Sequence, residues 1–192
     1  AFLLLPVGGV FGVFAAQDLF LFFLFYEIAV LPMYLLIGLW GTGPKEYSAM
    51  KLTLMLMGGS ALIVVGILVC FFQSGAPTFA MDEIAARGIP LATQAWVFPL
   101  MFFGSGTLGG LWPFHTWSPD GHASAPTAVS MLHAGVLMKL GAYGVVRLGL
   151  GLLPDGAMDL AWLVGTVACV NIVYGALSSM AQTDLKYVIA YS

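Results

Sequence analysis

Long apolar runs, separated by short polar turns, are the feature that most limits how this sequence can fold. The runs are long enough for membrane-spanning helices and lack the alternation of a transmembrane β-strand. Only 8% of the 192 residues are charged, whereas a soluble globular domain carries about 25%. The chain has too few charges to solvate the surface of a soluble protein. We therefore predict an integral membrane protein with an all-α fold, a polytopic transmembrane helix bundle.

The apolar runs predict a single transmembrane domain over residues 1–192, with about six spans and the start of a seventh. Because an apolar run opens the chain and another helix has just begun where it stops, we expect a central piece of a longer protein. A connection at 73–93 includes a short amphipathic helix, and Gly58-Gly59 is expected to interrupt the third span. The predicted spans are 1–16, a second capped by Gln17-Asp18 and running to Trp40, 49–72, 94–112, 128–149 and 160–180, with the seventh starting at Thr183.

Four glycines crowd the end of the fourth span, within Gly104–Gly110. Each glycine costs about 1 kcal/mol relative to alanine inside a helix, so this segment predicts a discontinuous, Gly-broken helix. In transporters, such breaks lie near the membrane midplane and line a cavity. Close packing of two helices through small residues would require the same glycines, and the sequence leaves both explanations open. The following segment, PFHTWSPDGHASAPT, contains three prolines and is predicted to be a loop.

Three ionisable residues lie inside apolar spans and are candidates for proton transfer. Lys139 is near the middle of Ala128–Gly149, where a charge costs about 2.5–3.5 kcal/mol and usually faces a bundle interior or a water path. Glu27 lies five residues before Pro32 in the second span, and His133 lies six residues before Lys139. We interpret Glu27 and Lys139 as members of a proton relay. A structural ion pair for Glu27, a lysine reaching the interface, and a merely hydrogen-bonded histidine are the alternatives.

Other polar residues are expected to support this site. Arg147 stays protonated, so it is predicted to be an anchor or a salt-bridge partner. His115, Asp120 and His122 could suggest a metal site, but their setting among prolines favours hydrogen bonds that fix a loop, and we predict no metal. The net charge of −3 indicates no nucleic-acid partner. No nucleotide-binding loop or haem motif is present.

The stretch FHTWSPDGHASAPTAVSMLHAGVLMKLGAYGVVR resembles the signature of a known membrane-protein family. This family comprises the antiporter-like membrane subunits of respiratory complex I, the NADH:quinone oxidoreductase, with relatives in Mrp-type cation/proton antiporters and membrane hydrogenases. FLFYEIAVLPMYLLIGLWG and AQTDLKYVIAYS are similar to the M-type subunits, also called chain 4. The resemblance covers nearly the whole chain and implies an antiporter-like fold.

The resemblance also implies a function, cofactors and partners. The chain would belong to a proton-translocating subunit of an enzyme complex, driven by quinone reduction elsewhere in that complex. It would hold no cofactor itself, while NADH, FMN, iron-sulfur clusters and quinone would be bound by partner subunits. Its partners would be other membrane-arm subunits, lipid, protons and water, and we expect it in a bacterial inner (plasma) membrane.

Within this family, Glu27 matches the glutamate of the fifth helix, Lys139 the lysine of the eighth, and His133 the histidine preceding it. These residues belong to a hydrated polar axis in the membrane. Family members also usually carry a second lysine seven residues before the histidine of the HxW motif. Counting back from His115 gives Leu108. A stand-alone antiporter, a membrane-hydrogenase subunit and a chiefly structural spacer therefore remain alternatives to the proton-translocating subunit.

Overall fold

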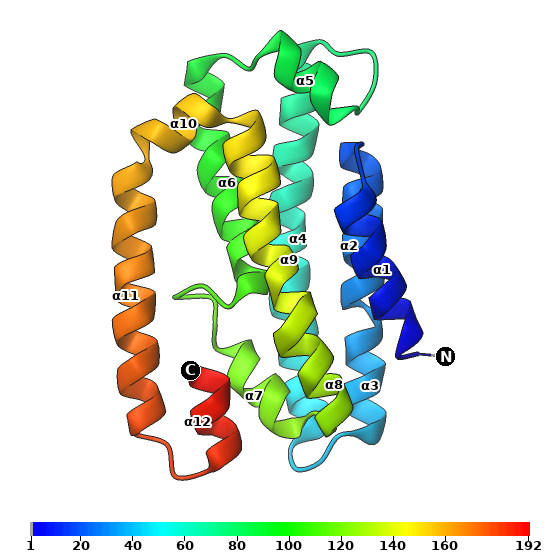
Figure 1. Ribbon diagram of the computed structural model, residues 1–192, viewed down its shortest axis with the longest axis vertical. Helices are drawn as coiled ribbons and strands as arrows, with labels where there is room; N and C mark the ends of the chain where they lie inside the picture. The colour runs from blue at the N-terminus through cyan, green and yellow to red at the C-terminus, as the bar shows by residue number, and fades with distance from the viewer. Residues whose placement is uncertain (1) are drawn as a thin grey trace.

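A computed structural model describes residues 2–192, which form a bundle of helices (Figure 1). Over these residues there is no β-strand, only an isolated bridge between Asp18 and Ala80. The all-α fold class is therefore confirmed. The elements are α1 (Leu4–Ala15), α2 (Leu19–Val30), α3 (Pro32–Trp40), α4 (Lys45–Ser74), α5 (Met81–Arg87), α6 (Leu91–Gly109), α7 (Trp117–Ser124), α8 (Thr127–Leu132), η1 (His133–Leu137), α9 (Met138–Gly144), η2 (Val145–Leu150), α10 (Pro154–Asp159), α11 (Ala161–Met180) and α12 (Leu185–Tyr191).

Four helical segments are long and apolar enough to cross a membrane: Leu19–Trp40, Lys45–Ser74, Thr127–Leu150 and Ala161–Met180. Large apolar side chains also cover the outside of the bundle, and Phe11, Phe72 and Ile172 are each more than 70% exposed. Such an exterior suits lipid and would be unusual on a soluble protein. These features indicate an integral membrane protein.

The second span starts at an aspartate cap and is divided at a proline. The carboxylate of Asp18 accepts hydrogen bonds from the backbone N–H groups of Phe20 and Leu21, at 2.8 and 3.1 Å, and so caps α2 as predicted. The span is divided into α2 and α3 at Pro32, because proline cannot donate the helical hydrogen bond. The short helix expected in the 73–93 connection is α5.

Two predictions based on glycine need correction. Helix α4 runs unbroken through Gly58-Gly59, so no interruption occurs there. Helix α6 likewise continues through Gly104 and Gly106 and ends only at Gly109. The reason is close packing: a Cβ on Gly59 would lie 2.8 Å from the carbonyl oxygen of Gly104. The glycines are needed for helix–helix contact, and this contact outweighs their low helix propensity.

The predicted discontinuity is present, but it begins at Gly110. This residue has a left-handed backbone (φ 76°), which glycine adopts without strain, and it ends α6. The chain then makes turns to Thr116 and becomes helical again as α7, below α6 in Figure 1. The prediction of a loop throughout PFHTWSPDGHASAPT was therefore wrong. Pro119 is compatible with α7 because it lies in the first turn, where its missing N–H has no helical partner.

The lysine-bearing span, Thr127–Leu150, contains two π-helical segments. It consists of α8, the π-helical turn η1, α9 and the π-helical segment η2. In η1 the N–H of Met138 donates to the carbonyl of His133, five residues earlier. A π turn inserts one extra residue and often marks a functional site. Here it begins at His133 and ends two residues before Lys139.

Candidate functional site

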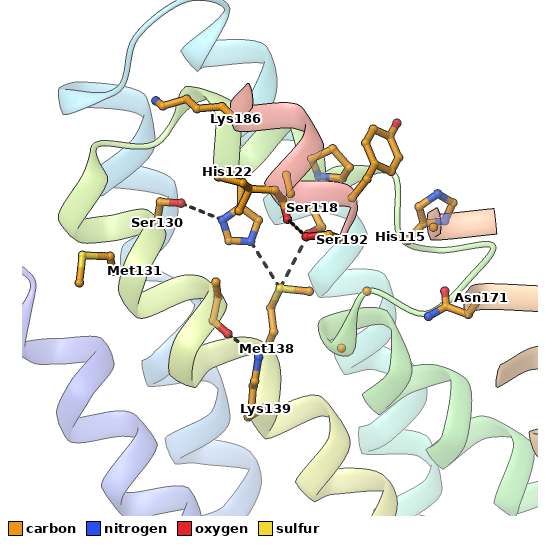
Figure 2. Close-up of a pocket in the computed structure, with 18 of the residues that line it drawn as sticks. His115, Ser118, His122, Ser130, Met131, Met138, Lys139, Asn171, Lys186 and Ser192 are labelled. Carbon is orange, nitrogen blue, oxygen red and sulfur yellow. Dashed lines mark hydrogen bonds between the residues drawn. The ribbon is translucent and has the colours of Figure 1, made fainter. Parts of the chain in front are cut away.

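A cavity of about 560 Å³, lined by both apolar and polar residues, lies beside the break between α6 and α7 (Figure 2). Its walls come from that break, from α7, from the span around η1, and from α11 and α12. The polar or conformationally special residues in its lining include Gly110, His115, His122, Lys139, Asn171 and Lys186. The cavity therefore joins segments that are far apart in the sequence, and it is large enough to hold several water molecules.

Lys139 lines this cavity near the middle of its apolar span. Its ammonium group donates a 2.7 Å hydrogen bond to the carbonyl oxygen of Ala134, which lies in η1. The residue is exposed in the described part of the chain rather than embedded in the core. The π turn thus provides a carbonyl acceptor for the charge at the cavity wall (Figure 2).

His133 lies in the core and forms a pair with His122 of α7. Its side chain is fully buried, and the two imidazole centroids are 4.5 Å apart. On another side the ring stacks on Trp117 at 5.2 Å, and the indole N–H of Trp117 donates to the carbonyl of Thr107 at 2.9 Å. Both nitrogens of His133 are buried without a hydrogen-bond partner among the described residues. Such orphaned polar atoms are costly and are typical of sites with a polar or protonic function.

His122 connects this pair to the cavity wall. Its Nδ1 lies 3.0 Å from the hydroxyl of Ser130, and its Nε2 lies 3.5 Å from the sulfur of Met138. The hydroxyl of Ser118 also donates to this sulfur, at 3.8 Å. Both ring nitrogens of His122 are therefore occupied. These contacts join α7 to α8 and α9.

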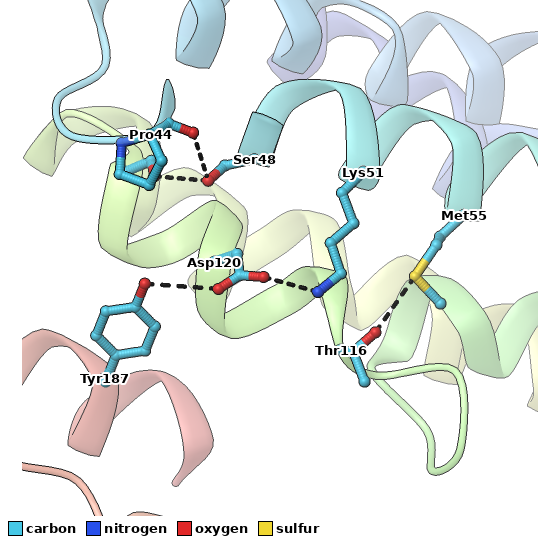
Figure 3. Close-up of polar contacts among 8 residues, drawn as sticks. Pro44, Ser48, Lys51, Met55, Thr116, Asp120 and Tyr187 are labelled. Atoms are coloured by element: carbon cyan, nitrogen blue, oxygen red, sulfur yellow. Dashed lines mark hydrogen bonds and ion pairs between the residues drawn. The ribbon is translucent and has the colours of Figure 1, made fainter. Parts of the chain in front are cut away.

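Asp120 forms an ion pair that sequence reasoning missed. Its carboxylate lies 2.7 Å from the ammonium of Lys51 in α4, and this is the single salt bridge within residues 2–192 (Figure 3). The phenol of Tyr187 donates to the other carboxylate oxygen at 3.5 Å. The sequence predicts that the span containing Lys51 starts at residue 49. The helix begins at Lys45, and a lysine two residues inside the predicted span was the available signal.

A second lysine contact was also missed. Lys186 of α12 donates to the carbonyl oxygens of Ala123 and Ala125, at 3.0 and 3.4 Å. These carbonyls are at the C-terminal end of α7, where the helix dipole is negative and attracts cations. Lysines from α4 and α12 therefore hold α7 at two points.

Glu27 and Arg147 do not line this cavity. One carboxylate oxygen of Glu27, Oε1, is buried without a hydrogen-bond partner among the described residues. Arg147 donates from Nη2 to the side-chain oxygen of Gln17 at 2.9 Å, and so anchors η2 to the junction of α1 and α2. In the described part of the chain, no ion pair joins Glu27 to Lys139. The structure thus places the predicted relay residues in two separate regions.

Leu108, where the family pattern expects a lysine, is completely buried in α6. Ser105, one turn earlier, is also fully buried, and its hydroxyl has no partner among the described residues. Its side chain lies against Gly144, since a Cβ on that glycine would be 2.8 Å from the hydroxyl oxygen. The α6–α9 interface therefore carries a small polar group where a charged one was expected nearby.

The geometry does not assemble a metal site from the loop residues. Over residues 2–192, no group of three or more His, Cys, Asp or Glu residues could hold a metal ion. Asp120 pairs with Lys51, and His122 contacts Ser130 and Met138. His115 packs edge-on against Tyr174, with centroids 4.8 Å apart. The three residues are thus engaged in separate contacts.

Sequence comparisons match this chain to one family over most of its length. The family model described as NADH:quinone oxidoreductase/Mrp antiporter, transmembrane, matches residues 16–192. An NAD(P)H-quinone oxidoreductase chain 4 of Picosynechococcus sp. is 43% identical over 100% of this chain and 35% of the relative. A chain 4 of Microcystis aeruginosa is 42% identical over 94% of this chain and 33% of the relative. The chain thus spans about a third of the length of these relatives, and the resemblance to chain 4 is confirmed.

Solved structures show the same arrangement of helices in three kinds of complex. A chain of respiratory complex I from Thermus thermophilus with bound NADH matches with a TM-score of 0.92 and 28% identity, over 99% of this chain and 41% of that one. A chain of an archaeal membrane-bound sulfane sulfur reductase matches with a TM-score of 0.91 and 28% identity, over 99% of this chain and 39% of that one. A chain of the Mrp complex from Dietzia sp. matches with a TM-score of 0.85 and 26% identity, over 99% of this chain and 21% of that one.

Proposed function

Because the chain belongs to the NADH:quinone oxidoreductase/Mrp antiporter family of transmembrane proteins, we propose that it is part of a proton-translocating membrane subunit of an NAD(P)H:quinone oxidoreductase. The identity of 43% to a chain 4 subunit supports this choice within the family. Other membrane subunits would be its partners, as in the multi-subunit complexes that it resembles. NADH, FMN, iron-sulfur clusters and quinone would be bound by those partners, in a bacterial inner membrane.

The observation that carries this proposal is the position of Lys139 in the wall of the cavity beside the break between α6 and α7. The lysine lies in an apolar span, and its ammonium group has one carbonyl partner in the described structure, Ala134. An ionisable group in such a place is a candidate for proton or ion transport, because a charge without a function would be costly there. A lysine amine can release and regain a proton when its surroundings change.

Each residue would have a distinct part in the transfer. Lys139 would exchange protons with water in the cavity, and the His122–His133 pair would continue the path into the core. An imidazole suits this role because it can both accept and donate a proton. Glu27, with a buried oxygen free of hydrogen bonds, would act through its charge on the balance between proton-bound and proton-free states. Water would have to connect Glu27 to the cavity.

Proton pumping by the assembled complex in membrane vesicles tests this function. Lys139→Met keeps the length of the side chain and removes the proton-carrying amine, so pumping per electron should fall strongly. Glu27→Gln removes the charge, and a partial loss is expected. Glu46→Gln is the matched control because Glu46 is exposed at the start of α4. An unchanged proton-to-electron ratio in Lys139→Met would remove Lys139 from the mechanism.

A cation/proton antiporter is the second candidate function. It is favoured by the match to the Mrp complex over 99% of this chain and by the inclusion of Mrp antiporters in the family model. The same polar residues would serve both functions. Purification of the full-length protein from its native membrane distinguishes them: redox subunits should copurify with a quinone oxidoreductase subunit, and an antiporter would purify without them.

A further inference from the structure

Met138 occupies a special place between Lys139 and the histidine pair. Its sulfur lies 3.5 Å from Nε2 of His122 and accepts a hydrogen bond from Ser118. In Figure 2 the sulfur lies between the imidazole of His122 and the side chain of Lys139. Met138 also lines the cavity and is packed against the hydrophobic core.

The terminal methyl group of Met138 packs against Gly110 at the helix break, and we call this position its seat. A Cβ on Gly110 would lie 2.8 Å from the terminal methyl carbon of Met138, so a side chain there would displace this methyl group. The missing side chain at Gly110 therefore leaves room for this methyl group. The left-handed turn that ends α6 and the thioether of Met138 fit together as one unit.

A proton cannot be relayed through the sulfur of Met138. A thioether sulfur can accept a hydrogen bond but has no hydrogen to pass on. Since the sulfur only accepts, Nε2 of His122 carries the hydrogen in this contact and Nδ1 accepts from the hydroxyl of Ser130. The chain of donors thus runs from Ser130 through His122 and ends at the sulfur.

Among the described residues, the histidine pair makes two polar contacts toward the cavity, both through His122. Both nitrogens of His133 are buried and make no hydrogen bond, and Trp117 stacks on its ring. Nδ1 of His122 contacts the hydroxyl of Ser130, which also lines the cavity and can pass a proton to the ring. A proton relayed through the imidazole then leaves by the other nitrogen, Nε2, which Met138 covers.

We propose that Met138 is a stopper: its thioether, seated against Gly110, separates Lys139 from the His122–His133 pair, and a proton passes only after this side chain leaves its seat. This inference rests on the proposed function of proton transfer. It adds a positioning residue that controls when the two proton-binding regions communicate. Met is suited to such a role because its unbranched side chain has three rotatable bonds and can change conformation within a packed site.

The test is the passive proton leak of the assembled complex, containing the full-length subunit, in liposomes without NADH or quinone. A potential is imposed and the internal pH is followed with a dye. Met138→Gln keeps the size of the side chain and replaces the sulfur by an amide that both donates and accepts. The leak should rise roughly tenfold, which corresponds to a barrier lowered by about 1.4 kcal/mol. Met138→Ser, which empties the seat, should also leak.

Two matched variants separate the stopper from general effects. Met138→Leu refills the seat with an apolar group, so its leak should equal that of the wild type. Met131→Gln adds the same amide to the same cavity, and the side chain of Met131 makes no hydrogen bond with the described residues. Its leak should also stay at the wild-type level. A rise in either control equal to that in Met138→Gln would overturn the proposal.

The double variant Met138→Gln with Lys139→Met decides whether the leak uses the proposed path. Removal of the amine should abolish the leak, and a leak that persists would overturn the stopper. Absence of a leak in both Met138→Gln and Met138→Ser would also overturn it. Failure of the proposed function would be seen in a different experiment. It would appear as normal proton pumping by the single variant Lys139→Met while the complex turns over.

Discussion

The ammonium nitrogen of Lys51 lies 2.7 Å from a carboxylate oxygen of Asp120, although the two residues are 69 positions apart. The pair joins α4, the longest helix, to α7, the short helix that follows the break in α6 (Figure 3). Asp120 and His122 both belong to α7, so the ion pair holds the helix that carries this imidazole. The side chains of Lys51 and Asp120 are 24% and 25% exposed, and the interaction is only partly shielded from solvent.

Loss of this ion pair should destabilise the subunit. Lys51→Met leaves Asp120 without its cation. The free energy of unfolding should fall by about 1–3 kcal/mol, a value between those for exposed and for fully buried ion pairs. The double variant Lys51→Met with Asp120→Asn should lose less stability than the sum of the losses in the two single variants, because no charge is left unpaired. Thermal unfolding of the detergent-solubilised complex measures the effect. Asp82→Asn, on exposed α5, is the control and should change little, and full additivity would show that the two residues do not interact.

Adjacent glycines in α4 should respond in opposite ways to the same substitution. A Cβ on Gly59 would lie 2.8 Å from the carbonyl of Gly104, whereas nothing lies within 4 Å of a Cβ on Gly58. Gly59→Ala should lower the free energy of unfolding by about 1–3 kcal/mol, because the added methyl group forces α4 and α6 apart. Gly58→Ala should be neutral or stabilise the helix by up to about 1 kcal/mol. Unfolding midpoints of the two variants, measured side by side, check the prediction, and equal midpoints would contradict it.

Restoration of the lysine that the family pattern expects should be unfavourable in this chain. Leu108 is fully buried, and an unpaired charge inside the membrane costs about 2.5–3.5 kcal/mol. Leu108→Lys should therefore reduce the amount of assembled complex, whereas Leu108→Met should not. The assembled fraction and the proton-to-electron ratio are measured on the same membranes.

A gain in pumping with normal assembly of Leu108→Lys would contradict this expectation. It would show that a carboxylate, Glu27 first of all, can reach the new ammonium group. Assembly without any gain in coupling would favour a mainly structural role for this part of the subunit.

Local sequence features predicted the four helical segments that are long and apolar enough to cross a membrane. The cap at Asp18 and the division of a span at Pro32 follow from side chains and backbone groups a few residues apart. Lys139 was identified because a lysine in an apolar run is conspicuous. Its acceptor, the carbonyl of Ala134, is presented by a π turn, and no sequence rule used here predicts such a turn.

Glycine propensity gave the wrong local structure in two places. Gly59 and Gly104 lie in unbroken helices because each faces the other helix at a distance that only glycine permits. Propensity is a weak preference, and the packing of two helices provides more free energy than a glycine costs. The break was instead found at Gly110, where the backbone is left-handed.

The sequence by itself determined that this protein is a bundle of membrane helices with a few costly charges inside, because hydrophobicity and the period of a helix are local properties. The tertiary structure decided which groups meet. It paired Lys51 with Asp120, brought His122 to His133, and placed Met138 against Gly110. These contacts depend on how helices pack and where one of them breaks, and packing is determined by the shapes of surfaces that are distant in the sequence.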